Sequence, residues 1–547
     1  MDASLLAPLA VAVLVAAVAR HYRLSAPLVL VTAGLAVGLI PGVPEITLQP
    51  DLVLFIILPP LLWSAGLESS YINMRRNRRS IGLLAVGLPL ATTAAVGAVA
   101  YYTVPAFSLA AALTLGAIVA PPDAVAATAV GRRLGLPRRI MTLLGGESLL
   151  NDATALTAYK VALGATIGTA VGWGMGLATF AVAAAGGVAV GIVLGTAIVS
   201  IRARLTDPLV ESAIGLVAPF VIYLIAEQVG GSGVLAVVVA ALILGQRFTH
   251  AHYATRLQDR AVWRAVQLVL ESFAFLRIGL ALPTVVQNMR GVRFSTLTVA
   301  SLAVFGTVLA VRVVWVVTFA YLPRMLSARI REREPAPTPG QVFILAWAGM
   351  RGVVSLAAAF GVPMTTMVGQ RFPGRPQLVF LTFVVVIGTL LLHGLTLPWL
   401  IRRLGVHGQQ ARTDAMAAAA AQDRAARAAA DRLDEVLATM KPSPTSERAA
   451  QALRGLTNRQ RNAARERLRL AGSAPDIDID IDTDGDGDGD GDGDETVAAV
   501  FRRLRLEMLA AERETFIAER DRGHIDDQVL RTLLHGLDLE EATLELD

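Results

Sequence analysis

Two carboxylates, an amide and a hydroxyl group lie within six residues of one another in an apolar stretch of the chain. Glu147 and Asn151 are four residues apart, and Ser148 and Asp152 have the same spacing. In a helix both pairs lie along one broad face. Oxygen ligands of this kind suit a hard cation. The alternative is a polar clamp between helices, but a clamp needs no pair of carboxylates, which favours the ion site.

Two other apolar stretches contain residues that interrupt a helix. Pro121 and Pro122, directly before Asp123, each remove a backbone donor and clash with the preceding turn. In the second stretch, glycines flank Arg351. A simple kink is the alternative at each place. A broken membrane helix is tolerated only where its backbone lines a cavity or is buried in protein, so two such interruptions together indicate a transport site.

The composition requires that these stretches cross a membrane. The 547 residues are 54% hydrophobic and 17% charged, with no cysteine. Soluble proteins carry about a quarter charged residues, so an ordinary cytosolic enzyme is excluded. The absence of cysteine excludes a disulfide scaffold, a thiolate metal site and a cysteine nucleophile. The basic residues lie in short loops between apolar runs, which gives no indication of a nucleic-acid partner.

Thirteen apolar segments are long enough to cross a bilayer, which takes about 20 residues. We number them spans 1–13 in chain order. They lie near residues 4–19, 27–41, 51–68, 80–103, 108–131, 140–162, 171–200, 208–228, 232–246, 265–286, 295–323, 340–362 and 376–401.

The basic residues between the spans predict the orientation of the chain. The loops after odd-numbered spans hold 22 basic residues, and those after even-numbered spans hold four. Because Lys and Arg accumulate in cytoplasmic loops, the N-terminus is predicted outside and the C-terminal tail inside the cell. The arginines predicted on the cytoplasmic side include Arg79, Arg132, Arg139 and Arg324.

Three charged residues fall near the middle of the membrane. At 1.5 Å per residue, Asp152 lies roughly 18 Å into span 6, Arg351 roughly 17 Å into span 12 and Asp123 roughly 22 Å into span 5. Charges at this depth are functional candidates. Arg312 is expected low in span 11, within reach of the cytoplasmic interface, and Arg277 in span 10 has no partner that the sequence identifies.

Spans 5 and 12 are seven apart, so their interruptions correspond if spans 8–13 repeat spans 1–6. An odd offset inverts the second copy and leaves span 7 as a connector. We therefore expect an all-α polytopic membrane protein of about 13 transmembrane helices, with inverted repeats, two broken crossing helices and a cytoplasmic tail.

The motifs around these residues match a known family. The chain contains Gly146-Glu147-Ser148-Leu149-Leu150-Asn151-Asp152-Ala153, Ala120-Pro121-Pro122-Asp123 and Gly349-Met350-Arg351-Gly352-Val353-Val354-Ser355-Leu356. In order and spacing, residues 5–404 resemble the sodium/proton exchangers, the Asn-Asp branch of the monovalent cation/proton antiporters.

This resemblance implies a homodimer in the plasma (inner) membrane, in contact with lipid. Residues 1–404 would form the antiporter domain and residues 405–547 the cytoplasmic tail. Within the antiporter domain, a dimerisation part near spans 1–3 and 8–10 would hold a core near spans 4–6 and 11–13, which moves as an elevator. The resemblance implies a transporter and not an enzyme.

The resemblance also implies roles for the polar residues. Asp152 would bind either the cation or the proton, and Glu147 would pair with Arg351 to hold the core together. An asparagine before the key aspartate is the family's mark of electroneutral one-for-one exchange. Many relatives have threonine at the position before Asp123, so a hydroxyl ligand is lost here. The residues that would complete the ion site are Asn151, Ser148, Asp123 and Pro122.

We hypothesise that Asp152 has no permanent cationic partner, because Glu147 engages Arg351. A proton and Na⁺ would then compete for it, and competition at one alternating-access site is sufficient for exchange without ATP. The predicted function is electroneutral exchange of Na⁺, or Li⁺, for H⁺, in pH homeostasis and without a cofactor. The alternatives are K⁺/H⁺ exchange at the same residues and a transport-inactive sensor that signals through the tail.

Two further acids lie near the predicted cytoplasmic ends of their spans. Glu68 ends span 3, and Glu271 is about 9 Å into span 10. Either they draw cations into an inward-open funnel or they pair with loop arginines. The sequence leaves both alternatives open.

The tail differs from the rest of the chain in charge. Residues 405–547 hold 19 basic and 30 acidic residues. Segments 413–440, 444–471 and 496–521 are predicted to be amphipathic helices that associate across a dimer, regulate transport or remain solvated. Residues 476–495 hold eleven acids and almost no apolar surface, so they are predicted to be disordered.

Part of this acidic stretch formally fits a calcium-binding loop. An Asp-Gly repeat also matches that pattern by chance, so we assign no metal site with it. Weak binding of a divalent cation, or of a regulator, by the tail stays an alternative. The residues that match the pattern are Asp484, Asp486, Asp488 and Glu495.

Overall fold

The computed structural model describes residues 3–22, 24–40, 50–168, 173–205, 207–247, 251–289, 293–333, 336–406, 409–470 and 496–546. Over these residues the chain is helical, and the one β-type pairing is an isolated bridge between Thr365 and Arg371. The all-α class predicted from the sequence is confirmed.

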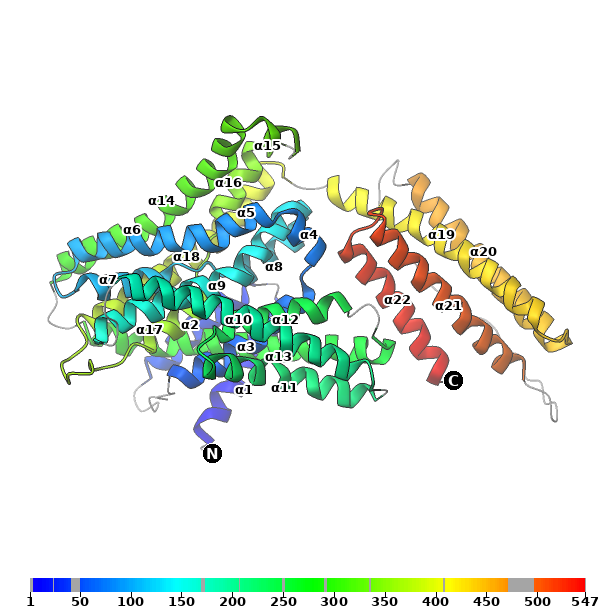
Figure 1. Ribbon diagram of the computed structural model, residues 1–547, viewed down its shortest axis with the longest axis horizontal. Coiled ribbons are helices and arrows are strands. Elements are labelled where there is room, and N and C mark those ends of the chain that lie inside the picture. Colours follow the sequence, from blue (N-terminus) through cyan, green and yellow to red (C-terminus); the bar gives the residue numbers. More distant parts are fainter. Residues whose placement is uncertain are drawn as a thin grey trace. The chain divides into compact units, whose positions relative to one another are not determined.

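The chain forms two compact units (Figure 1). We call Met1–His250 together with Asp259–His407 the membrane unit, and Ala251–Gln258 together with Gly408–Asp547 the tail unit. Helix α13 begins with residues of the tail unit and continues into the membrane unit.

The membrane unit contains the helices that hold the predicted site. They are α1 (Ala3–His21), α2 (Ala26–Gly38), α3 (Pro50–Glu68), α4 (Tyr71–Arg76), α5 (Arg78–Gly82), the π-helix η1 (Leu83–Gly87), α6 (Leu88–Thr103), α7 (Leu109–Val119), α8 (Ala124–Leu134), α9 (Arg138–Ile167), α10 (Trp173–Arg202), α11 (Pro208–Gln228), α12 (Gly233–Arg247), α13 (Tyr253–Gln287), α14 (Phe294–Leu326), α15 (Ala328–Arg333), α16 (Pro339–Trp347), α17 (Val353–Phe360) and α18 (Arg375–Arg403).

Six helical segments among the described residues are long and apolar enough to cross a membrane. Shorter apolar helices include α2, α7 and α12. The long helix α9 is not among the six, because its charged and polar side chains lower its hydropathy. The six segments are Arg78–Thr103, Ala178–Arg202, Pro208–Gln228, Tyr253–Gln287, Phe294–Leu326 and Arg375–Arg403.

Each of the two segments predicted to be interrupted consists of two helices. α7 ends at Val119 and α8 begins at Ala124, with the two prolines between them. α16 ends at Trp347 and α17 begins at Val353. Proline cannot donate the hydrogen bond that would continue α7, which explains the first break. α7 packs against α9, α17 and α18, so the two broken segments lie beside the helix that carries the polar motif.

The tail unit is a bundle of four helices. They are α19 (Gln409–Thr439), α20 (Pro444–Leu470), α21 (Val497–Asp521) and α22 (Asp527–Leu546). α19 packs against α20 and α21, and α21 packs against α22. Leu433, Leu453, Leu504, Met508 and Phe516 lie in its buried clusters. The amphipathic faces therefore pack on one another rather than remaining solvated, and α22 is a helix that the sequence analysis did not predict.

The acidic stretch 476–495 lies outside the described residues, as do the calcium candidates Asp484, Asp486, Asp488 and Glu495.

Candidate functional site

The two interrupted segments are joined directly to each other. The backbone N–H of Asp123 donates to the carbonyl of Met350 over 2.6 Å. A β-carbon on Gly352 would overlap with Oδ2 of Asp123, so the carboxylate fills the space that any other side chain would need. Gly352 is the N-cap of α17, and a helix N-terminus favours a negative charge. The fold thus places the Asp123 carboxylate at the start of α17.

Arg351 is fully buried and binds the end of the other broken segment. Its Nε donates over 3.2 Å to the carbonyl of Val119, the last residue of α7. Its Nη1 donates to the carbonyl of Gly349, and its backbone N–H donates to Oγ1 of Thr389 over 3.0 Å. A cation at a helix C-terminus satisfies carbonyls that have no partner within the helix. Arg351 therefore caps α7.

Arg312 on α14 holds the second break in the same way. It is 1% exposed and donates to the carbonyls of Ala346 over 3.1 Å and Leu345 over 3.2 Å, at the end of α16. Its Nη1 and Nη2 also bind the two carboxylate oxygens of Glu147, the latter over 3.1 Å. This bidentate pair joins α14 to α9.

One prediction from the sequence is therefore wrong, because Glu147 pairs with Arg312 and not with Arg351. Arg312, expected within reach of the cytoplasmic interface, is buried. The depth calculation applied to Arg351 would have identified Arg312, because each lies eleven residues, about 17 Å, from the predicted cytoplasmic end of its span. The choice between two such arginines depends on which helix packs beside α9.

Asn151 connects α9 to the break between α7 and α8. Its Nδ2 donates to the carbonyl of Pro122 over 3.1 Å. Because a carbonyl only accepts hydrogen bonds, this contact fixes the orientation of the amide. The other amide atom, Oδ1, is buried and has no hydrogen-bond partner among the described residues. An orphaned buried oxygen of this kind is available as a cation ligand.

Asp152 is 8% exposed and makes no ion pair with any residue that the structure describes. Asp123 is close enough to interact with it electrostatically. Ser148, one turn before it on α9, is half-buried. The structure thus gathers Asp152, Asn151, Pro122 and Asp123 around the first break.

A comparison with the other buried acids makes Asp152 distinct. Seven of the eight buried acids in the described part of the chain form an ion pair with at least one arginine, and Asp152 is the eighth. The eight are Glu147, Asp152, Glu211, Asp259, Asp423, Glu512, Glu519 and Asp538.

The remaining candidates lie elsewhere. Glu68 is exposed and pairs with Arg132 over 3.3 Å, which matches the loop-arginine alternative. Glu271 is half-buried, and its Oε1 accepts a 2.8 Å hydrogen bond from Gln267. Arg277 is half-buried on α13, and no ion pair joins it to the residues that the structure describes.

Comparisons with known proteins give the family. Residues 9–403 match the family described as "Sodium/hydrogen exchanger, transmembrane". An uncharacterized Na⁺/H⁺ exchanger of Mycobacterium tuberculosis is 32% identical over 547 residues, which covers 98% of this chain and 95% of the relative. A sodium, potassium, lithium and rubidium/H⁺ antiporter of Bacillus subtilis is 30% identical over 393 residues, which covers 68% of this chain and 57% of the relative.

A solved structure shares the fold. The sodium proton antiporter MjNhaP1 from Methanocaldococcus jannaschii aligns with a TM-score of 0.58 and 18% identity, covering 73% of this chain and 97% of that one. Together with the match over residues 9–403, this means that the chain belongs to the sodium/hydrogen exchanger family of membrane cation/proton antiporters, which are transporters and not enzymes.

Proposed function

We propose that this protein exchanges Na⁺ for H⁺ across the plasma membrane, with both ions competing for Asp152. The observation that carries the proposal is that Asp152 is the one buried acid in the described chain without an arginine partner. A buried carboxylate that lacks a fixed counter-charge is neutralised by whatever it can bind. A proton and a small metal cation both serve, and each excludes the other.

The surrounding oxygens suit a dehydrated cation. Oδ1 of Asn151 is buried without a hydrogen-bond partner among the described residues, and the Asp123 carboxylate interacts electrostatically with Asp152. Ser148 lies one turn away on the same helix. We infer that these groups, with the Pro122 carbonyl, replace part of the hydration shell of Na⁺ next to Asp152.

We infer that exchange is electroneutral, because the site offers one carboxylate whose charge is not already compensated. Glu147 is neutralised by Arg312, and the Asp123 carboxylate lies at the start of α17. One Na⁺ or one proton then occupies Asp152 on each passage, so each cycle moves one positive charge in each direction. A second unpaired acid at the position of Asn151 would change this stoichiometry.

The orientation and the assembly are part of the same proposal. The arginine-rich loops support an outside N-terminus and a cytoplasmic tail. The resemblance supports a homodimer formed near spans 1–3 and 8–10, with spans 4–6 and 11–13 as the moving core. Cross-linking of cysteines introduced on α1 or α11 tests the dimer, and the absence of native cysteine keeps the background clean.

K⁺/H⁺ exchange at the same residues is the second candidate. The Bacillus subtilis relative is named as an antiporter of potassium, lithium and rubidium as well as sodium. Both candidates use Asp152, and they differ only in the size of the cation that the site accepts.

The deciding experiment measures proton flux in proteoliposomes that contain a pH dye. Na⁺, Li⁺ and K⁺ pulses are applied separately to wild type, Asp152→Asn and Asp207→Asn, with the membrane potential free and then clamped. Asp207→Asn is the matched control, because asparagine keeps the hydrogen bond that Asp207 accepts from the N–H of Leu209 at the start of α11.

We expect Na⁺-driven flux that is lost in Asp152→Asn, kept in Asp207→Asn and unchanged by the clamp. A response to K⁺ alone would establish the second candidate. Flux that changes with the clamp would overturn electroneutral exchange. No flux from folded wild-type protein would favour a transport-inactive sensor, and full flux in Asp152→Asn would remove Asp152 from the site.

A further inference from the structure

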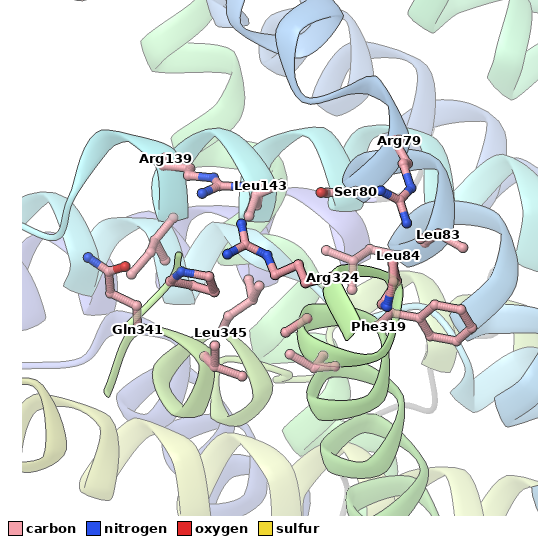
Figure 2. Close-up of a pocket in the computed structure, with 16 residues that line it drawn as sticks. Arg79, Ser80, Leu83, Leu84, Arg139, Leu143, Phe319, Arg324, Gln341 and Leu345 are labelled. Carbon is pink, nitrogen blue, oxygen red and sulfur yellow. The ribbon is translucent and has the colours of Figure 1, made fainter. Parts of the chain in front are cut away.

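A pocket lies between four parts of the membrane unit: α5 with η1, α9, α14 and α16. It has a cavity volume of about 90 Å³ and is open on one side. The residues gathered around Asp152 do not line it, so it is separate from the proposed ion site. Figure 2 shows its lining side chains.

The polar residues of this pocket are basic or uncharged. Arg79 lies on α5, Arg139 lies at the start of α9, and Arg324 lies in the last turn of α14. In Figure 2 Arg139 and Arg79 lie above Arg324, and Gln341, Leu345 and Phe319 lie below it. Among the described residues that line the pocket, none is acidic. Guanidinium groups have the donor geometry that suits an anionic phosphate group.

Some apolar residues of the pocket lie beside the polar ones, namely Ile140, Pro323, Pro337 and Val342, and others lie one turn further along the same helices. Each of four polar residues is followed, toward the helix middle, by an apolar lining residue four positions away, on the same face of the helix. The pairs are Arg79 with Leu83, Arg139 with Leu143, Arg324 with Ala320 and Gln341 with Leu345. On α14 the apolar lining continues to Val316, a further turn along.

This arrangement matches the cross-section of a membrane surface. All four helices present their polar residue at the end that the arginine bias assigns to the cytoplasm, and their apolar residues deeper. A phospholipid has the same order, with its phosphate at the interface and its acyl chains inside. Basic pockets between transmembrane helices on the cytoplasmic side are sites for anionic headgroups.

We propose that this pocket binds an anionic phospholipid, with its phosphate among Arg79, Arg139 and Arg324 and part of an acyl chain against Leu143, Leu345 and their neighbours. A free phosphate or nucleotide would satisfy the arginines but leave the two apolar turns unused. The lipid uses both parts. This site is additional to the proposed ion exchange and does not depend on which cation is transported.

Lipid in the pocket would stabilise the helices that carry the Glu147–Arg312 ion pair, next to the proposed ion site. Glu147 is one turn beyond Leu143 on α9, and Arg312 is one turn beyond Val316 on α14. The pocket therefore ends one turn from the buried Glu147–Arg312 pair. At its other wall, the π-helix η1 is fixed by Trp315, whose Nε1 donates to the carbonyl of Leu83 over 3.1 Å. A bound chain would strengthen the packing of α9, α14 and η1 on one another.

Native mass spectrometry of the purified full-length protein tests this proposal without any ion gradient. Phosphatidylglycerol and phosphatidylcholine with identical acyl chains are titrated in parallel. The variants are Arg139→Gln/Arg324→Gln, which removes charge, and Leu345→Trp, which fills the apolar part and keeps the arginines. Arg331→Gln is the matched control, because Arg331 is an exposed arginine of α15 that does not line the pocket.

We expect wild type and Arg331→Gln to bind phosphatidylglycerol at least about tenfold more tightly than phosphatidylcholine. The double arginine variant should bind phosphatidylglycerol about 10- to 30-fold more weakly, since each arginine near an anionic headgroup contributes about a fivefold effect. Leu345→Trp should weaken both lipids. Equal binding of the two lipids by wild type, or wild-type binding by both variants, would overturn the proposal.

A thermal-shift measurement on wild type keeps the proposal testable if a variant does not fold. Short-chain phosphatidylglycerol should raise the melting temperature more than short-chain phosphatidylcholine or inorganic phosphate, because a ligand that binds only the folded state stabilises it. Stabilisation by phosphate alone, equal to that by the lipid, would show a site for a soluble anion and overturn the lipid assignment.

Discussion

The membrane unit and the tail unit both pair buried arginines with carboxylates, but beside the two breaks of the membrane unit the buried arginines also bind helix ends. In the tail, Arg505 is fully buried between Glu512 and Glu540, over 2.7 and 2.6 Å. This arginine binds side chains of the opposite charge. In the membrane unit, Arg312 divides its hydrogen bonds between Glu147 and the end of α16, and the guanidinium of Arg351 binds the carbonyls of Val119 and Gly349.

The difference separates acids with a permanent arginine partner from the acid that we propose binds the exchanged ions. Each of the four buried acids of the described tail has an arginine partner, so its charge is satisfied permanently. The membrane unit also buries Arg351, but its guanidinium donates to the carbonyls of Val119 and Gly349 and not to Asp152. An acid without a fixed partner is the one that can exchange its counter-ion.

The largest loss of stability is expected when a buried arginine–carboxylate ion pair, which both units contain, is broken. Arg312→Gln leaves Glu147 buried without a counter-charge, which costs about 3–5 kcal/mol of stability. Arg351→Gln leaves only carbonyls without a donor and costs about 1–3 kcal/mol. Thermal unfolding in detergent, followed by size-exclusion chromatography, compares the two.

A second substitution tests which arginine Glu147 needs. Glu147→Gln should restore most of the stability of Arg312→Gln and none of the stability of Arg351→Gln. The opposite pattern would show that Glu147 pairs with Arg351 in the folded protein.

In the tail, Arg505→Gln should cost about 3 kcal/mol, because two carboxylates lose their shared partner. The measurement is hydrogen exchange of α21 peptides in the intact protein. Arg454→Gln is the control, since its pair with Asp434 is exposed and contributes about 0–1 kcal/mol. Equal protection of α21 in the two variants would contradict a structural role for the buried pair.

A further substitution gives Asp152 a fixed positive partner, like the partners of the buried acids in the tail. Ser148→Lys places a cation four residues before Asp152 on the same helix face. The lysine would form an ion pair with the Asp152 carboxylate and so compete with Na⁺ and H⁺ for it. This should lower exchange at least about 100-fold, which corresponds to roughly 2.7 kcal/mol. Flux in proteoliposomes measures it, and Ser148→Met controls for size. Unchanged exchange in folded Ser148→Lys would mean that Asp152 needs no freedom from a partner.

A smaller effect is expected from crowding the contact between the two breaks. Gly352→Ala places a methyl group where it would overlap with Oδ2 of Asp123, so the carboxylate must move. Overpacking costs about 1–3 kcal/mol, which corresponds to a loss of roughly 5- to 150-fold in exchange or cation affinity. Gly306→Ala on α14 is the control, because no atom lies within 4 Å of the position that its methyl group would take. Similar flux in the two variants would contradict the contact.

The smallest effect concerns acid stability of the tail. Burial raises the pKa of Glu519, but its hydrogen bond with His524 and the charges of Arg424 and Arg522 outweigh burial and hold this pKa below the ordinary 4.5. Because the folded-state pKa is the lower one, Glu519 contributes stability above pH 4.5 that is lost as the pH falls through the folded-state pKa. The protection of α21 against hydrogen exchange, relative to the intrinsic exchange rate at each pH, should therefore fall below that pH in wild type, and Glu519→Gln should flatten this dependence.

Much of the fold follows from local sequence features. The apolar segments and arginine-rich loops predicted a helical membrane chain, and the pair of prolines predicted the end of α7. The helix α22 was missed although Val529, Leu530, Leu533 and Leu537 have helical spacing, so that signal was present in the sequence. The partner of Glu147 could not be predicted from local spacing, because Arg312 is 165 residues away along the chain.

Helix geometry and the missing proline N–H act over a few residues, so local sequence was enough to predict which side chains share a face of α9 and where α7 ends. Contacts between helices far apart in the chain pair Arg312 with Glu147, set Arg351 as the cap of α7 and leave Asp152 with neither arginine. Helix-end carbonyls and carboxylates compete for the same buried arginines. The outcome of that competition depends on which helices lie side by side, and spacing along the chain does not encode it.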